Sequence, residues 1–156
     1  MKTFKGYLMS LNACKPAVEW AGDKPIEQVV AECHRGDWLL WLAQKCGVEL
    51  QPLTLAKGHC ANTVRHLMTD KRSTRAVDVA IAFGEGRATR EELDAAAYAA
   101  ASAYAAASAD AAAYAAADAA YAANQQETAD ICRKYIGEFI IEKVNQNLNP
   151  NSHERI

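Results

Sequence analysis

The chain has 156 residues, of which 51% are hydrophobic and 23% are charged, and its formal net charge is −2. These values predict one folded domain, because a disordered chain carries fewer apolar side chains and a larger net charge. A net charge so close to zero argues against a nucleic acid or an anionic membrane as a bulk partner. No stretch approaches the ~20 consecutive apolar residues of a membrane-spanning helix.

The cysteines are few and irregularly spaced. They are Cys14, Cys33, Cys46, Cys60 and Cys132. This set contains no CxxC pair and does not resemble the even, closely spaced array of a disulfide-rich secreted domain. The N-terminal segment holds a lysine but too short an apolar stretch for a secretory signal. We therefore expect reduced thiols and a cytoplasmic protein.

The overall pattern is helical. No proline lies between Pro52 and Pro150, and no segment alternates convincingly with the period of two that strands require. Only residues 4–9 are left as a stretch that could be extended. We expect an all-α fold, a compact single-domain bundle of six or seven helices with one long alanine-rich helix. The domain is predicted to cover residues 1–148, and residues 149–156 are expected to form a flexible tail.

Capping residues divide the first third of the chain into three predicted helices. The expected N-caps are Asn12, Asp23 and Asp37, and the expected C-terminal glycines are Gly22, Gly36 and Gly47. In the second of these helices, Pro25 falls in the first turn, where a missing amide hydrogen costs nothing.

Four more helices are predicted beyond Pro52. Apolar residues at helical spacing indicate one helix to about residue 69 and another that ends at Gly84. Thr89 and Glu92 form a capping box, in which each side chain accepts the other residue's amide, and this opens the alanine-rich helix. A last helix is expected over about 127–146.

The alanine-rich segment covers residues 94–123, where 21 of 30 residues are alanine. Alanine has the highest helix propensity, so this segment should be helical. At 1.5 Å per residue an unbroken helix would be about 45 Å long. A helix of this length must protrude, line a long bundle or break once.

Polar side chains of this segment gather on one stripe of the expected helix. The stripe contains Tyr104, Asp110, Tyr114, Asp118 and Tyr121, and alanines fill the opposite face. The alanine face would allow a second helix to approach closely. The stripe is either the solvated side of a packed helix or a contact face, since tyrosine offers a large contact area at low entropic cost. We include its three tyrosines among the candidate ligand-binding residues.

Three segments occur in the order found in a known family. They are CKPAVEWAG at 14–22, CHRGDWLLWL at 33–42 and ADICR at 129–133, with the alanine–tyrosine–aspartate helix between the second and the third. The chain resembles the alanine-rich immunity proteins predicted in bacterial polymorphic-toxin loci and also found in phage genomes. The most specific part of the resemblance is RGDWLLWL at 35–42. The resemblance implies a mostly helical, non-catalytic protein that neutralises a target, and it transfers no catalytic or ligand residue.

The RGDWLLWL segment also has ordinary structural interpretations. Asp37 is expected to cap a helix rather than to belong to an exposed RGD loop. The side chains of Trp20, Trp38 and Trp41 are expected in the core. Arg35 is a candidate ligand-binding residue, which either pairs with Glu19 or Asp37 or faces a ligand.

A metal or catalytic site is not expected. His59, Cys60 and His66, with His34 or Cys33, lack the closely paired spacing of zinc ligands. His59 and Cys60 are neighbours that point about 100° apart on a helix, so they do not form a Cys–His nucleophile. The chain has no Walker loop and no GxGxxG, HExxH or GxSxG motif. We therefore expect no enzyme activity, no metal and no cofactor.

A basic connection is the remaining candidate site. Arg65, Lys71, Arg72 and Arg75 fall within eleven residues, and Ser73 or Thr74 is expected to open the next helix. Arginines beside the free amides of a helix start can bind an anion. The alternative is a solvated loop with surface ion pairs.

Two binding functions follow from these features. The first is neutralisation of a protein toxin or defence effector. The second is a sponge for an anionic, nucleotide-like small molecule, a phosphate-bearing second messenger whose base would stack on the tyrosines. Basic residues that converge in a pocket would favour the sponge, and a convex basic surface would favour a protein partner. The sequence leaves homo-oligomerisation open.

Overall fold

The computed structural model describes residues 3–107 and 111–150, and it describes side chains for 3–101 and 124–150. Within these ranges every regular element is a helix, so the predicted all-α class is confirmed. The helices are α1 Phe4–Ser10, α2 Lys15–Ala21, α3 Ile26–Glu32, α4 Gly36–Cys46, α5 Leu50–Asn62, the 3-10 helix η1 Arg65–Leu67, α6 Lys71–Gly84, α7 Arg90–Ala107 and α8 Ala111–Leu148.

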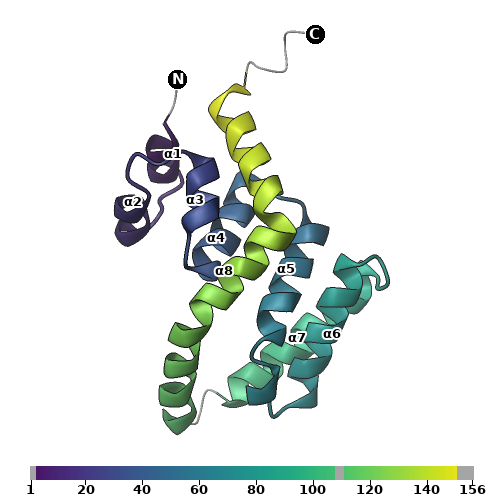
Figure 1. Ribbon diagram of the computed structural model, residues 1–156. Coiled ribbons are helices and arrows are strands. Elements are labelled where there is room, and N and C mark those ends of the chain that lie inside the picture. The colour runs from purple at the N-terminus through teal and green to yellow at the C-terminus, as the bar shows by residue number, and fades with distance from the viewer. Residues whose placement is uncertain (1–2, 108–110, 151–156) are drawn as a thin grey trace.

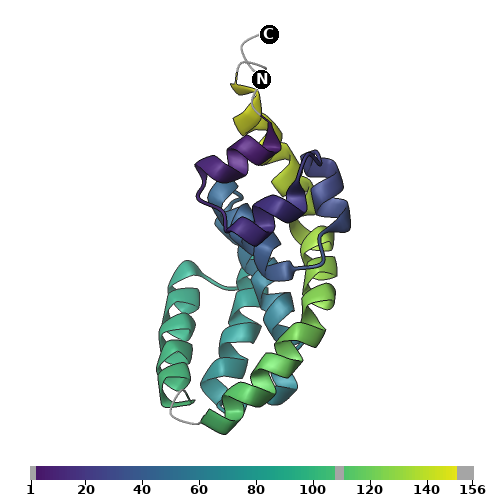
Figure 2. The same cartoon turned by 90° about the vertical axis from the view of Figure 1, so that its left-hand side faces the viewer.

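Helix α8 is the spine of the molecule (Figure 1). Helices α3, α4 and α5 pack along it, α6 packs on α5, and α7 packs on α6. The turned view shows α7 at the outer edge of the bundle, beyond α6 (Figure 2). The short helices α1 and α2 lie at the opposite side, next to α3 and α4 (Figure 1).

The core is built on one face of α8. Five residues at intervals of three or four positions have no exposed side-chain surface; they are Ala129, Cys132, Ile136, Ile140 and Val144. This spacing repeats once per helical turn, so the five side chains form one stripe. Leu39, Leu42 and Ala43 supply the facing stripe of α4.

The first helix covers residues 4–9, the one stretch that the sequence left open as extended. Phe4 and Leu8 lie one helical turn apart, and both are buried. The Thr3 hydroxyl accepts the Gly6 amide at 3.0 Å and caps the helix. A threonine followed by two apolar residues four positions apart was the signal for this helix in the sequence.

In the first third of the chain, two of the three glycines predicted to end helices do so. None of the three predicted N-cap residues caps a helix. Gly22 and Gly47 end α2 and α4 with φ of 49° and 93°, values that favour glycine. The residues that cap α2, α3 and α4 are Cys14, Pro25 and Arg35 instead of the expected Asn12, Asp23 and Asp37. Asn12 has a φ of 60° in the turn after α1, whereas a residue that caps a helix start typically has an extended backbone.

The helix after Pro52 is shorter than expected. It begins at Leu50, ends at Asn62 and is followed by the 3-10 turn at 65–67, whereas a helix to about residue 69 was predicted. Helix α6 ends at Gly84 as predicted, but it is opened by Asp70, not by Ser73 or Thr74. The capping box of α7 is present, since the Glu92 amide donates to Thr89 Oγ1 at 3.1 Å.

The alanine-rich segment is divided between two helices. Its first part belongs to α7, which lies on α6, and its second part opens α8. Of the three alternatives for this segment, a single break fits the described residues. The helix expected over about 127–146 is the C-terminal part of α8. Since this last helix and the second part of the alanine-rich segment are one helix, the division adds no helix. Within the described residues, α1 and the 3-10 helix η1 raise the count above the six or seven helices expected.

Two glycines set the distance between α5 and α6. A Cβ atom at Gly84 would lie 2.7 Å from the Leu55 Cα, and one at Gly58 would lie 2.9 Å from the Ile81 Cγ1. Both values are shorter than a van der Waals contact. The two helices can therefore approach this closely only without side chains at these positions.

Replacing Gly84 with alanine is expected to lower the free energy of unfolding by about 1–3 kcal/mol, the usual cost of overpacking. Urea denaturation followed by circular dichroism measures the change. The matched control is Gly6→Ala at an exposed position of α1, where a Cβ would meet only the Thr3 hydroxyl at 3.2 Å. An unchanged unfolding midpoint for Gly84→Ala would show that α5 and α6 are not held at this distance.

Candidate functional site

The arginines of the basic connection are held by neighbouring carboxylates. Arg65 in η1 forms a two-pronged ion pair with Asp78 of α6, with distances of 2.6 Å from Nη1 to Oδ1 and 2.9 Å from Nη2 to Oδ2. Arg72 pairs in the same way with Asp70, at 3.1 Å from Nε and 2.8 Å from Nη2. These two guanidinium groups already have the partner that an anionic ligand would replace.

Asp70 has two roles at the start of α6. Its carboxylate accepts the Arg72 backbone amide at 2.8 Å, which caps the helix, and it also accepts the Arg72 side chain. These hydrogen bonds lower the pKa of Asp70 to about 2. The carboxylate therefore stays charged over the physiological pH range and neutralises the basic connection locally.

The remaining candidate residues do not form one site. Lys71 and Arg75 are exposed on the first turns of α6. Arg35 lies in a separate place, between α3 and α4. The side chains of Tyr104, Tyr114 and Tyr121, and the whole polar stripe with its opposite alanine face, lie outside the residues whose side chains are described.

A different site emerges where α1 and α2 face α3 and α4. A cavity of about 480 Å³ lies there, and we call it the tryptophan pocket. Its walls are mainly apolar, and the residues that line it include Phe4, Leu8, Trp20, Arg35, Trp38 and Trp41. The volume lies within the range of ligand pockets, about 300–1,000 Å³.

Two tryptophan rings on the wall of this pocket pack with each other and with the ring of His34 beside it. The ring of Trp20 lies 5.7 Å from His34 and 6.2 Å from Trp38, and His34 lies 6.0 Å from Trp38. Both contacts of the histidine are edge-to-face, an arrangement that the ring quadrupoles favour. Lys24 lies 4.6 Å above the Trp20 ring and donates to the Trp20 carbonyl at 2.7 Å. The three rings are therefore held by one another and by the lysine.

Arg35 is the principal basic group of the pocket. Its Nη2 lies 2.6 Å from Asp37 Oδ2, its Nε lies 3.1 Å from Oδ1, and its guanidinium carbon lies 4.4 Å from the centre of the Trp38 ring. Of the two carboxylates considered from the sequence, Asp37 is thus its partner. Asp37 does not cap α4 as expected, because its carboxylate is bound to Arg35 from within the first turn.

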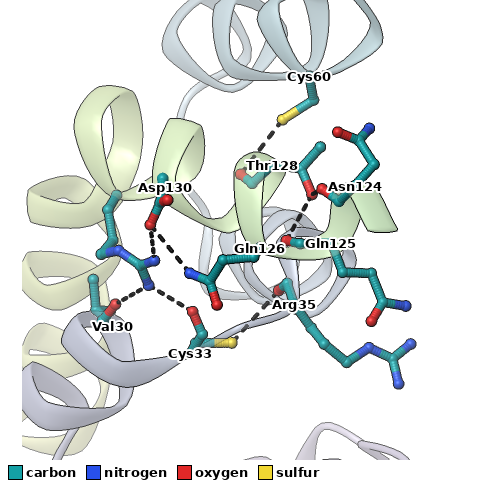
Figure 3. Close-up of polar contacts among 10 residues, drawn as sticks. Val30, Cys33, Arg35, Cys60, Asn124, Gln125, Gln126, Thr128 and Asp130 are labelled. Carbon is teal, nitrogen blue, oxygen red and sulfur yellow. Dashed lines mark hydrogen bonds and ion pairs between the residues drawn. The ribbon is translucent and has the colours of Figure 1, made fainter. Parts of the chain in front are cut away.

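The segment that carries Arg35 is held from behind by α8 (Figure 3). Arg133 donates to the carbonyl oxygens of Val30 at 3.1 Å and Cys33 at 2.6 Å. These carbonyls lie at the end of α3 and lack a partner within that helix. At Gly36 a Cβ atom would overlap Thr128 of α8, so this position accepts only glycine. The side chain of Arg35 points away from these contacts (Figure 3).

The three tryptophans are half-buried on the pocket wall, where they pack against the core instead of lying within it as expected. The buried stripe of α4 is formed by Leu39, Leu42, Ala43 and Cys46. Trp38 and Trp41 flank this stripe. Five consecutive large apolar residues at 38–42 cannot all face one side of a helix, and this was the available signal that some of them border a surface.

A second cavity of about 560 Å³ lies between the start of α5, the end of α6 and α8. Phe139, with 45% of its surface exposed, lies on its wall together with Tyr135 and Leu55. Charged residues of both signs, Glu49, Glu142 and Lys143, also line it. Nothing at this cavity selects a particular ligand.

Two of the residues considered as metal ligands, His59 and Cys60, have other contacts. The His59 ring is stacked on Tyr135 with 4.5 Å between ring centres. Cys60 contacts Cys132. In the described part of the chain no three His, Cys, Asp or Glu side chains are grouped so that they could hold a metal ion. No helix of the described residues has the length and apolar character needed to cross a membrane.

Comparison with known proteins adds no relative. No family model matches the chain, and neither a curated protein nor a solved structure matches it.

Because the ion pair between Asp70 and Arg72 requires a charged carboxylate, we expect the protein to lose stability when Asp70 is protonated in acid. The folded-state pKa of Asp70, about 2, lies below its ordinary value of 3.8. Its stabilising contribution is therefore complete above about pH 4 and is lost as the pH falls through about 2. The melting temperature of the wild type should fall more between pH 5 and pH 2 than that of Asp70→Asn, which cannot ionise. Equal falls in both proteins would contradict the ion pair.

Proposed function

We propose that this chain is a non-enzymatic neutralising protein of immunity or anti-defence type, which sequesters a protein effector or toxin. The tryptophan pocket is the contact site in this proposal. It receives an apolar side chain of the effector between the short helices α1 and α2 and the start of α4.

The observation that carries the proposal is the composition of this pocket. Residues that dominate binding energies in protein interfaces are enriched in tryptophan, tyrosine and arginine, and they cluster in well-packed depressions. Trp20, Trp38 and Trp41 line this depression beside Arg35. Ring contacts and the ion pair to Asp37 hold two of these tryptophans and the arginine before a partner arrives, which lowers the entropic cost of binding.

The resemblance to immunity proteins supports the same surface. Its most specific segment, residues 35–42, forms the start of α4 and supplies Arg35, Trp38 and Trp41 to the pocket. The segment at 14–22 supplies Trp20 from α2. Two segments that carry the resemblance therefore meet at one depression.

A nucleotide sponge is the second candidate. Lys71 and Arg75 are exposed on the first turns of α6, where a helix start attracts anions. A phosphate at this place would also have to displace the carboxylates of Asp70 and Asp78 from Arg72 and Arg65. The sponge is thus the less favoured of the two functions.

The proteins encoded by the genes on either side of this one are the first effectors to test. Each is expressed alone and together with the chain, and cell growth is measured. A neutralised effector should be toxic alone and tolerated in the pair. Growth that stays inhibited with every toxic neighbour, despite soluble expression of the chain, would contradict the proposal for these effectors.

For an effector that is neutralised, titration calorimetry places the contact site. Trp38→Ala and Arg35→Ala should each weaken binding by about 30-fold, which corresponds to the ~2 kcal/mol of a dominant interface residue. Phe139→Ala is the matched control, because Phe139 is apolar and exposed but lies at the second cavity. A larger loss of affinity for Phe139→Ala than for the pocket variants would place the contact site at the second cavity and contradict the tryptophan pocket.

The sponge makes a different prediction for the basic connection. Calorimetric titration with cyclic dinucleotides should then show binding that the double variant Lys71→Ala, Arg75→Ala weakens and that added salt weakens further. Under our proposal the same titrations give no heat of binding, and the double variant neutralises the effector as the wild type does.

A further inference from the structure

Two thiols far apart in the sequence meet inside the bundle. Cys60 of α5 and Cys132 of α8 are 72 positions apart, and their Sγ atoms lie 3.9 Å from each other. Cys132 is fully buried, whereas 8% of Cys60 is exposed. The other two buried cysteines bond to backbone carbonyls near them in the chain, Cys33 to Arg35 and Cys46 to Ala43.

The two thiols differ in pKa and in exposure, so one of them can react with an oxidant before the other. The pKa of Cys60 is lowered because its thiolate can accept the single proton of Cys132 in a hydrogen bond, and the pKa of Cys132 is raised by the same contact and by burial. Cys60 therefore ionises first, and it is also the thiol that a small molecule reaches first. The thiolate is the reactive form of a cysteine.

We propose that Cys60 and Cys132 are a redox-sensitive pair, which forms a reversible disulfide between α5 and α8 when the chain meets a hydroperoxide.

The reaction balances with the hydroperoxide as the only oxidant. The Cys60 thiolate attacks one peroxide oxygen, the O–O bond breaks, and with hydrogen peroxide the hydroxide that leaves takes up a proton to become water. Cys60 is now a sulfenic acid. The Cys132 sulfur then loses its proton and attacks the Cys60 sulfur, the S–O bond breaks, and a second water leaves. Two thiols have given two electrons to one peroxide.

The disulfide would change the contacts that α8 makes with the start of α4, the segment that carries pocket residues Arg35 and Trp38. While both thiols are protonated, Cys132 donates to the Gly36 carbonyl at 3.7 Å, and Cys60 donates to the Thr128 carbonyl at the same distance (the latter drawn in Figure 3). Both bonds are lost when the sulfurs join, because no proton remains on either. Gly36 lies between Arg35 and Asp37, so the pair couples the redox state of the chain to the start of α4.

The test uses the full chain with Cys14→Ser, which removes the one exposed cysteine and its intermolecular disulfides. The protein is treated with hydrogen peroxide, then measured by intact mass spectrometry, peptide mapping and thermal melting. We expect the loss of two hydrogen atoms and a crosslink between the peptides of Cys60 and Cys132. The melting temperature should rise, because the crosslink closes a long loop in the unfolded chain. Dithiothreitol should restore the starting mass and melting temperature.

Matched variants assign the reaction to this pair. Cys46→Ser in the same background should oxidise like the parent, whereas Cys60→Ser and Cys132→Ser should form no internal crosslink. Cys132→Ser should also leave a sulfenic acid on Cys60 that dimedone traps. If either serine variant fails to fold, the peptide map of the parent decides alone. A crosslink that involves Cys33 or Cys46, or no crosslink at a peroxide dose that oxidises Cys14 in the unmodified chain, overturns the proposal.

Discussion

The junction between α3 and α4 depends on its contact with α8. Arg133 binds the carbonyls of Val30 and Cys33 that α3 leaves without partners, and the missing side chain of Gly36 lets Thr128 approach the next helix. An arginine that satisfies buried carbonyls cannot be removed without leaving them unpaired, which costs more than the bond itself contributes. The direction in which α4 leaves this junction determines which of its residues reach the core. It also determines which ones border the surface where α1 and α2 lie.

The tryptophan pocket and the basic connection illustrate two ways in which charge is used. At the pocket, the Arg35 guanidinium forms an ion pair with Asp37 and lies over the Trp38 ring. The charge of the site is therefore close to neutral, and most of its surface is apolar. In the basic connection, Asp70 forms an ion pair with Arg72, and Asp78 forms one with Arg65. Surface pairs of this kind contribute little stability, but they remove the excess of positive potential that the linear sequence suggests. Neither site presents a bare cluster of cations.

Much of the fold could be predicted from the sequence, because helix patterns are local. The helix over about 127–146, the end of α6 at Gly84 and the capping box of α7 all depend on residues within one or two turns. The candidate site was less predictable, since it depends on contacts between distant segments. The pairing of Arg65 with Asp78 spans a loop. The exposure of Trp38 depends on where α4 begins, and Thr128 of α8 contributes to that. The first helix was missed because its two apolar anchors fall in a segment too short for a clear periodic pattern.

The outer position of α7 has a consequence for how this chain can change over evolution. Ala96 is its only buried residue within the described side chains. One inserted residue turns everything beyond it on a helix by about 100° and advances it by about 1.5 Å. In the C-terminal half of α8 such a slip would rotate Ile136 and Ile140 out of the core. In α7 it mostly exchanges one alanine for another, and helix propensity is unaffected. Insertions and deletions in α7 should therefore be tolerated, whereas α8 has a buried residue in every turn from Ala129 to Val144 and should not tolerate them.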